Sequence, residues 1–294
     1  MYRKKVVVAM ITYNHEKYVK QCLEGIFSQK YNGKLELVIF DDASTDRTRE
    51  IIEETIHEWN RKHKYKITRY YNAYNLGPDI APIYRSQMYK NFDGEFFCRI
   101  EGDDYWTTPF FIKKHVNFLT ANKEFLMSFS KMNLLFEESG ETFIHPEQQE
   151  LSEWGGVRYI TDEQLSKYNP IGSVNNCFYR QVTYNQYPIE LVYIATGDWL
   201  THFVISWSGK IGFLDEVLST YRIHSKGMWS GRSEEERRNP QLKIIKFFAY
   251  ILKSKPGKYD ENLIMYLDRF YPERTIALTV ADVIEYVQPV INDI

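Results

Sequence analysis

The stretch KVVVAMITY (residues 5–13) decides the fold of this 294-residue chain. It is a continuous apolar run rich in β-branched residues, which is typical of a strand buried on both faces of a parallel sheet. The segment after it, HEKYVKQCLEGIFSQ, repeats Tyr18, Cys22 and Ile26 at helical spacing and predicts a helix with Asn14 as N-cap. A buried strand followed at once by an amphipathic helix predicts an α/β protein.

The same alternation continues through the first third of the chain. It predicts strands in LELVIFDD (35–42), KITRYYN (66–72) and EFFCRIEGDD (95–104), and helices over residues 44–63 and 77–92. Strands alternating with helices imply a mostly parallel sheet with helices on both faces. Such sheets bind ligands in the crevice beyond the carboxyl ends of their strands.

The regular alternation weakens in the second third of the chain. The pattern predicts a helix opened by Pro109, a hairpin with SG near its turn, a polar loop to about residue 158, a short helix in TDEQLSKYN, a strand in IGSVNNCFYRQ, a helix from Asp198 to Gly209 and a strand from residue 210. The chain looks mainly helical beyond that strand. We therefore divide it into an α/β part, residues 1–232, and a helical extension, residues 233–294.

Composition excludes several classes of protein. With 37 basic and 39 acidic residues the net charge is -2, so the chain has no general electrostatic footprint for nucleic acid. Cys22, Cys98 and Cys177 form no Cys-x-x-Cys pair, which favours reduced thiols over a disulfide framework or a zinc site. The apolar runs are too short to span a bilayer, and the start of the chain lacks a signal-peptide pattern. We expect a cytoplasmic protein.

Three carboxylates follow the fourth predicted strand, in the stretch RIEGDDYW. Glu101, Asp103 and Asp104 lie so close in sequence that they must diverge into water or share a cation. Asp41 and Asp42 end the second predicted strand. In a parallel sheet both acidic clusters point toward the same rim, which indicates a ligand site unless both are merely polar strand exits.

Six motifs in chain order carry a resemblance to a known family: ITYNHEKYV, VIFDDASTDRT, NLGP, IEGDDYWTTP, GDW and YRIHSKGMWSG. From about residue 5 to residue 232 the chain resembles the bacterial family 2 glycosyltransferases, which have the nucleotide-diphospho-sugar transferase fold called GT-A. The resemblance implies an inverting, metal-dependent transferase with a mixed α/β sheet. It would move a hexose from a nucleoside diphosphate sugar, UDP-sugars first, to an acceptor hydroxyl in the synthesis of a surface polysaccharide, lipid-linked glycan or glycoprotein glycan.

The resemblance assigns the nucleotide pocket to the ends of the first two strands. It implies that Thr12, Tyr13 and Asp41 contact the nucleotide base, where a carboxylate can accept the imino N–H of uracil or thymine. Asp42 ends the same strand. It could bind the nucleotide or, like Asp46, cap the next helix.

The resemblance assigns the metal site, for Mn²⁺ or Mg²⁺, to the acidic turn. The family pattern is Asp-x-Asp-Asp, whereas this chain has Glu101-Gly102-Asp103-Asp104, so its first carboxylate is one methylene longer. By position Asp103 would ligate the metal, Glu101 would face the ribose or the metal's water shell, and Gly102 would let the backbone approach a ligand. Asp104 would hold the loop by hydrogen bonds. His224 resembles the family's late histidine ligand, although a lone histidine can also be purely structural.

The catalytic base follows from the motif TGDWL. Asp198 matches the family's general base, and it could also cap the helix that follows, whose dipole would hold the carboxylate ionised. Trp199 could floor the acceptor site or be buried in the core. Lys226 and Arg232, in HSKGMWSGR, could reach a phosphate from a lid, or belong to an ordinary loop.

Two other functions are compatible with an α/β sheet of this kind. One is a nucleotide-sugar-binding protein without turnover. The other is a sugar nucleotidyltransferase, which would need a glycine-rich phosphate loop after the first strand, whereas TYNHEKYV contains no glycine. The later segment KIIKFFAYILKSK could rest on an anionic membrane or pack against the rest of the chain.

Overall fold

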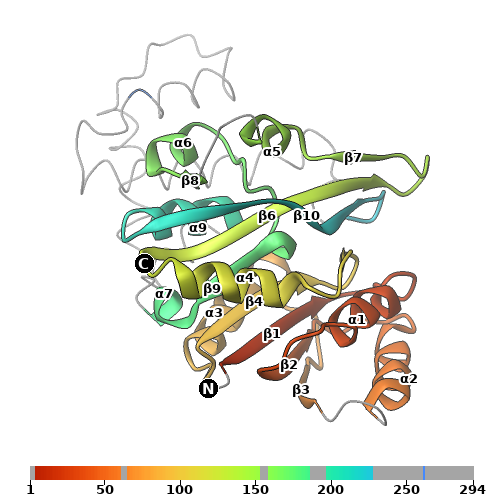
Figure 1. Cartoon of the computed structure of the whole chain (residues 1–294). Coiled ribbons are helices and arrows are strands. Elements are labelled where there is room, and N and C mark those ends of the chain that lie inside the picture. The colour runs from red at the N-terminus through yellow and green to blue at the C-terminus, as the bar shows by residue number, and fades with distance from the viewer. Residues whose placement is uncertain (1–3, 61–64, 153–157, 186–196, 228–260, 262–294) are drawn as a thin grey trace, which may run out of the picture.

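The computed structural model describes residues 4–60, 65–152, 158–185, 197–227 and 261. The first half alternates strands with helices in the order β1 (Lys5–Thr12), α1 (Val19–Phe27), β2 (Lys34–Asp41), α2 (Thr48–Asn60), β3 (Lys66–Tyr71), α3 (Gly77–Lys90) and β4 (Phe96–Glu101) (Figure 1). The second half contains β5 (Tyr105–Trp106), α4 (Phe111–Ala121), β6 (Phe125–Phe136), β7 (Thr142–Ile144), α5 (Pro146–Leu151), β8 (Arg158–Ile160), α6 (Asp162–Lys167), the 3₁₀ helix η1 (Val174–Asn176), β9 (Cys177–Arg180), α7 (Gln181–Asn185), α9 (Asp198–Ser206) and β10 (Lys210–Ile223).

The strands of the described residues form one mixed sheet in the order β3-β2-β1-β4-β9-β6-β10-β5. The first four of these strands run parallel to their neighbours, as the strand–helix alternation predicts. Strand β9 is antiparallel to both β4 and β6, while β10 runs parallel to β6. Short strands β7 and β8 pair outside this path, with β6 and β10 respectively.

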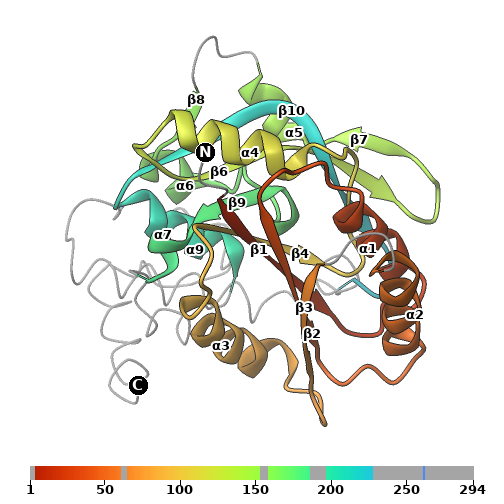
Figure 2. The same ribbon diagram turned by 60° about the horizontal axis from the view of Figure 1, so that its bottom comes forward.

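Helices cover both faces of the sheet, and each face has its own hydrophobic core. On one face α1, α2 and α4 pack against strand residues such as Val8, Ile39 and Cys98. On the other face α3 and α9 pack against the alternate residues, including Phe97 and Tyr179. Figure 2 shows α1 and α2 on one side of strands β1 to β3 and α3 on the other. Residues of opposite parity on one strand thus enter different cores.

Strand register brings the predicted site residues to one edge of the sheet. Thr12 at the end of β1 is paired with Asp41 at the end of β2, and Ile11 is paired with Glu101 at the end of β4. Because the three strands are parallel and adjacent, their carboxyl ends meet at one rim. The expectation that both acidic clusters share a rim is correct.

Two local predictions are wrong. Asn14 is not the N-cap of α1: its φ is 55°, its Oδ1 accepts the N–H of Thr45 at 2.8 Å, and the helix begins after Tyr18. The polar stretch before residue 158 contains the short helix α5 rather than loop alone. The predicted hairpin is correct, since β6 and β7 are antiparallel and Gly140 has a φ of 73° in the turn.

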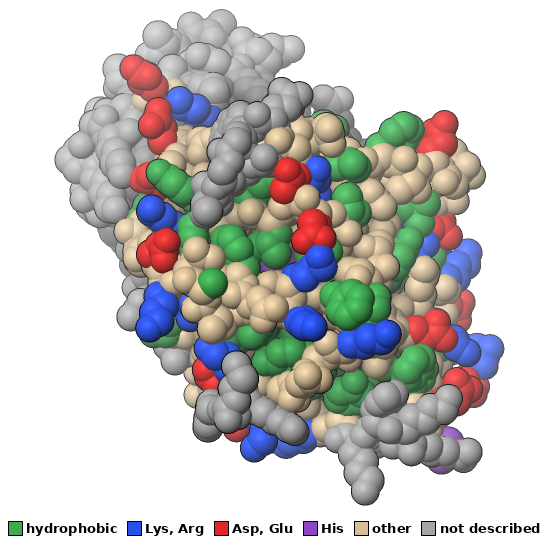
Figure 3. All heavy atoms as spheres, in the orientation of Figure 1, with side chains coloured by type: hydrophobic (Ala, Val, Ile, Leu, Met, Phe, Trp, Pro, Cys, Tyr) green, Lys and Arg blue, Asp and Glu red, His purple; other side chains and the backbone are tan. Residues whose placement is uncertain are grey.

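The surface of the described residues does not point to a particular kind of partner. On the face shown in Figure 3, acidic and basic side chains are interspersed with hydrophobic ones. Within the described part of the chain, no helix combines the length and the apolar character needed to cross a membrane. The predicted boundary at residues 232–233, and the helical extension beyond it, lie outside the described residues apart from residue 261.

All three cysteines are buried free thiols. Cys22 lies on α1 directly beneath the acidic turn, and its Sγ is 3.5 Å from the backbone oxygen of Glu101. Burial, followed by the nearby Asp104, raises the pKa of Cys22 well above its ordinary value. The thiol therefore acts as a small apolar group in the floor of the site.

Candidate active site

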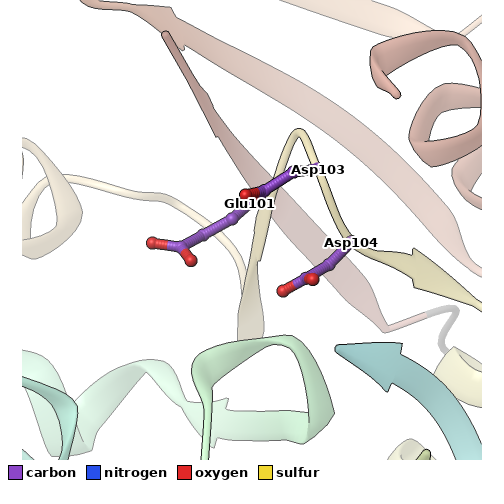
Figure 4. A group of neighbouring side chains, drawn as sticks. All are labelled: Glu101, Asp103 and Asp104. Atoms are coloured by element: carbon purple, nitrogen blue, oxygen red, sulfur yellow. The ribbon is translucent and has the colours of Figure 1, made fainter. Parts of the chain in front are cut away.

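The acidic turn joins β4 to β5 at the rim of the sheet. Gly102 donates its N–H to the oxygen of Ile11 at 2.7 Å, which ties the turn to the end of β1. Carboxylate oxygens of Glu101, Asp103 and Asp104 lie within 4.8 Å of one another. Figure 4 shows the three side chains leaving the turn on the same side. They do not diverge into water, so the first of the two explanations for this cluster fails.

Two imidazoles converge on Asp103. Nε2 of His224 lies 3.1 Å and Nε2 of His15 lies 3.6 Å from the same Oδ2 atom. Burial would raise the pKa of Asp103, but the two histidines outweigh it and lower the pKa below its ordinary value. Burial lowers the pKa of His15, while Asp103 opposes that shift. Asp103 is thus an ionised carboxylate close to two imidazole nitrogens.

Position 102 has no room for a side chain, because neighbouring residues occupy the space where a Cβ atom would lie. A Cβ at this position would lie 2.7 Å from Oγ1 of Thr12 and 3.0 Å from Nδ1 of His15. Thr12 is buried, and its Oγ1 has no hydrogen-bond partner among the described residues. The glycine therefore allows Thr12 and His15 to approach the acidic turn.

Asp104 faces the neighbouring strand. Its Oδ1 accepts the backbone N–H of Arg222 at 2.8 Å, and its Oδ2 accepts from Nδ2 of Asn175 at 3.0 Å. Burial, together with Asp103 and Glu101, raises the pKa of Asp104 well above its ordinary value. Since both oxygens are engaged, this residue supports the turn as the sequence predicts for it.

Arg222 fixes the turn from β10. Its Nε donates to the backbone oxygen of Asp103 at 2.8 Å, and its guanidinium lies between the rings of Tyr18 and Tyr105. It also pairs with Glu137. The arginine precedes His224 by two residues, so the end of β10 supplies the support of the turn and the residue just after it supplies the imidazole beside Asp103.

Glu101 is a strongly perturbed carboxyl of the turn. Burial, then the charges of Asp103 and Asp198, raise its pKa to about 8, while Arg85 and Arg99 act in the opposite direction. A divalent cation would reverse this penalty, because it favours the ionised form of every carboxylate near it.

The donor set fits a divalent cation. Oδ1 of Asp103 is buried without a hydrogen-bond partner among the described residues, which is unusual for a carboxylate oxygen. Asp104 is engaged with protein groups, so Asp103, Glu101 and His224 would hold the ion. Carboxylates with one imidazole suit Mn²⁺ better than Mg²⁺, which prefers oxygen ligands alone.

Asp198 is the first residue of α9 and does not cap it. The N-cap is Gly197, with a φ of 153° and no side-chain hydrogen bond. Burial raises the pKa of Asp198, whereas Arg99 and Arg85 lower it, and Oδ1 lies 3.3 Å from Nη2 of Arg99. At this position the helix dipole favours the ionised carboxylate, whereas burial acts against it, so an ionised Asp198 stays a prediction. A raised pKa suits a proton acceptor.

The carboxylates at the end of β2 are engaged with the protein. Asp41 accepts the N–H of Ser44 at 3.0 Å and also contacts the Ser44 hydroxyl and Arg49, so its side chain is fully buried. Asp42 accepts the N–H groups of Leu76 and Gly77 at 2.9 and 3.0 Å. Asp42 thus caps α3 and not the next helix, α2.

The remaining predicted residues are dispersed. Tyr13 is exposed at the end of β1 and Lys226 is exposed after β10. Trp199 donates its indole N–H to the oxygen of Leu165 at 2.6 Å and packs against the core, which favours the predicted burial over an acceptor floor. Arg232 lies outside the described residues.

Four residues of the site were not predicted from the sequence: His15, Arg99, Arg222 and Tyr221. Tyr221 lies on β10, and burial together with Glu101 and the neighbouring aspartates raises its pKa. Arg99 had a visible signal, because a charge at alternate spacing to Phe97 interrupts an otherwise apolar strand. His15 and Arg222 had none, since their partners are distant in sequence.

Comparison with known proteins agrees with this geometry. The sheet order with an acidic turn after its fourth strand defines the GT-A fold, the class predicted from the sequence. The family model "Glycosyl transferase family 2" matches residues 7–180, and the chain belongs to this family. The resemblance drawn from the motifs is confirmed.

Individual relatives are distant. An uncharacterized protein of Mycobacterium tuberculosis is 27% identical over 236 residues, which cover 79% of this chain and 62% of that protein. The structure of Staphylococcus aureus TarS 1-349 with UDP-GlcNAc has a TM-score of 0.65 at 18% identity, covering 98% of this chain and 80% of that one. A mannosyltransferase of Pyrobaculum calidifontis with GDP-Man and Mn²⁺ has a TM-score of 0.57 at 15% identity, covering 98% and 74%. The chain therefore spans about six tenths of the mycobacterial protein.

Proposed function

We propose that this chain is a metal-dependent, inverting glycosyltransferase that moves a hexose from a nucleoside diphosphate sugar, with UDP as the first candidate, to an acceptor hydroxyl. The observation that carries the proposal is the cluster of Glu101, Asp103 and Asp104 at the rim, with His224 3.1 Å from Asp103 and the charge of Asp198 acting on Glu101. Structural relatives with UDP-GlcNAc and with GDP-Man and Mn²⁺ support a sugar-nucleotide donor.

Each residue has a role in this scheme. A cation bound at the acidic turn would neutralise the diphosphate of the donor. Thr12, Tyr13 and Asp41 would border the nucleotide. Asp41 would give up one of its contacts with Ser44 or Arg49 to accept a hydrogen bond from the base. Asp198 would accept the proton of the acceptor hydroxyl as that oxygen attacks C1 from the face opposite the nucleotide.

Donor binding is the first test. Thermal unfolding with UDP, GDP and dTDP sugars, with and without Mn²⁺, should show stabilisation only by the cognate donor, by about 2.7 kcal/mol at one hundred times the Kd. Mn²⁺ and nucleotide should each tighten the other, and Asp103→Ala should abolish that coupling. Equal stabilisation of the Asp103→Ala variant would contradict the metal role.

Turnover is the second test, and it separates an enzyme from a binding protein. Asp198→Asn should lower transfer, or donor hydrolysis where the acceptor is unknown, by about 10²-fold or more, because the general base is lost. Its Kd for UDP should stay within twofold of wild type. Normal donor binding without any turnover in the wild-type chain would instead favour the binding-protein alternative.

For the acceptor we propose a chemical class and not a particular molecule. We take it to be the hydroxyl of a glycan, a lipid-linked glycan or a glycoprotein. A peripheral membrane contact through KIIKFFAYILKSK stays a prediction, because that segment lies outside the described residues. Flotation with anionic liposomes, with and without residues 233–294, tests it.

A further inference from the structure

A largely buried arginine, Arg99, precedes the acidic turn on β4 and pairs with Asp198. Arg99 precedes Glu101 by two residues on β4, so its side chain enters the same face of the sheet as Phe97. Its side chain is only 12% exposed. A charge in that position of a central strand costs folding free energy unless it is paired, so its partners define what it does.

The guanidinium of Arg99 is held by two aromatic rings and two hydrogen-bonding groups. Its Cζ lies 5.8 Å from the ring centroid of Tyr89 and 5.7 Å from that of Tyr179. Its Nη2 lies 3.3 Å from Oδ1 of Asp198 and 3.4 Å from the hydroxyl of Tyr179. One nitrogen therefore bridges a carboxylate at the start of α9 and a buried tyrosine of β9.

The contacts from Asp198 through Arg99 and Tyr179 lead back to α9, the helix that carries Asp198. The Tyr179 hydroxyl lies 2.7 Å from Nε2 of His202, which is fully buried on α9 one turn after Asp198. Arginine can only donate, so the Tyr179 oxygen accepts from Arg99, and the Tyr179 hydroxyl can donate to His202. Burial lowers the pKa of His202 well below its ordinary value, so the neutral imidazole can accept that proton.

We propose that Arg99 is a positioning residue that holds the Asp198 carboxylate toward the acidic turn, with Tyr179 and His202 fixing the guanidinium from behind. This inference rests on the proposed function, in which Asp198 is the general base. The geometry makes α9 contact the β4–β9 face at two successive turns, through Asp198 and through His202. The carboxylate is then oriented by the sheet that carries Glu101 rather than by the helix alone.

The test combines Arg99→Met with Asp198→Asn in a double-mutant cycle on the full chain. Arg99→Met should lower kcat at least tenfold while the Kd for UDP and the KM for donor change less than twofold. In the Asp198→Asn background the same substitution should lower kcat less than twofold, because Arg99 acts through Asp198. Arg69→Met, which breaks the Arg69–Glu53 pair at the β3 edge of the sheet, is the matched control and should leave kcat unchanged.

A second readout does not need turnover. The changes in melting temperature among the same four proteins should be non-additive if Arg99 and Asp198 are paired. In the turnover assay, Arg99→Lys should keep part of the kcat that Arg99→Met loses, because lysine keeps the charge. Additive melting temperatures, or an equal fractional loss of kcat in both backgrounds, would overturn the positioning role alone. Full turnover by Asp198→Asn would overturn the base assignment and this proposal together.

Discussion

His15 shows how one side chain can matter without belonging to any acidic motif. It lies 3.6 Å from the Asp103 oxygen that His224 also contacts, and it occupies the space that a side chain at position 102 would need. The two histidines come from opposite ends of the described chain, since one follows β1 and the other follows β10. Asp103 is therefore held in place by both.

His15→Asn should weaken Mn²⁺ binding in the presence of UDP by about tenfold, because groups that orient a metal ligand are commonly worth that much. The measurement is Mn²⁺ affinity by calorimetry or by electron paramagnetic resonance of the free ion. His57→Asn, an exposed histidine on α2, is the matched control. An affinity unchanged in His15→Asn would show that Asp103 is oriented by His224 alone.

At the scale of elements, the start of α3 is held by a residue that follows β2, although α2 and β3 lie between the two in sequence. Asp42 follows β2, yet its carboxylate accepts the N–H groups of Leu76 and Gly77 where α3 begins, and Asn72 donates to it as well. The motif NLGP is thus bound to the motif VIFDDASTDRT by one carboxylate. The position of α3 then fixes Tyr89 and, through it, the wall beside Arg99.

Asp42→Ala should lower the free energy of unfolding by about 2 kcal/mol, because hydrogen bonds to a charged acceptor are worth about 1.5–3 kcal/mol and the freed N–H groups lose their partner. Denaturant unfolding without ligand measures this directly. Asp93→Ala removes an exposed partner of Lys5 and should cost less than about 1 kcal/mol. Equal losses in the two variants would contradict the capping role.

At the scale of the whole molecule, two buried neutral histidines give stability a pH dependence. Burial lowers the pKa of His115 to about 3 and that of His202 well below its ordinary value. In the unfolded chain both titrate near 6.5, so below that pH the unfolded state binds protons that the folded state cannot. Stability is therefore present above pH 6.5 and is lost as the pH falls toward the folded pKa values.

For His115 the loss between pH 7 and pH 5 should be about 2 kcal/mol of unfolding free energy. His115→Gln should remove that part of the pH dependence, whatever it does to stability at pH 7. Urea unfolding at the two pH values measures it, with His57→Gln as the exposed control. If both variants keep the wild-type slope, His115 does not stay neutral in the folded chain.

Much of the parallel half of the sheet was predictable because its signals are local. The runs of β1, β2 and β4 are mostly apolar, and the acidic residues at the ends of β2 and β4 meet at one rim by the geometry of parallel sheets. The strand in IGSVNNCFYRQ was predicted and is β9, but its antiparallel place between β4 and β6 was not predictable, because its partners are set by packing between segments far apart in sequence.

In the site, too, the residues with a local signal were predictable and the contacts between distant segments were not. Glu101, Asp103 and Asp198 stand out by motif and position, whereas the contacts that orient them join residues dozens of positions apart. Asp42 shows the difficulty best, since a strand-end aspartate beside STDRT looks like a cap for α2. The sheet instead presents it to α3, because β3 brings Asn72 and the NLGP loop back alongside β2.

The buried thiol under the acidic turn has a chemical consequence. Cys22 contacts the backbone of Glu101 from the core side, and its high pKa leaves almost no thiolate in the folded chain. A thiol reagent can reach Cys22 only when local unfolding separates α1 from β4. The alkylation rate at Cys22 therefore measures how often this part of the site unfolds locally. Ligands that bind the acidic turn should slow that reaction at Cys22 more than at Cys177, the buried first residue of β9.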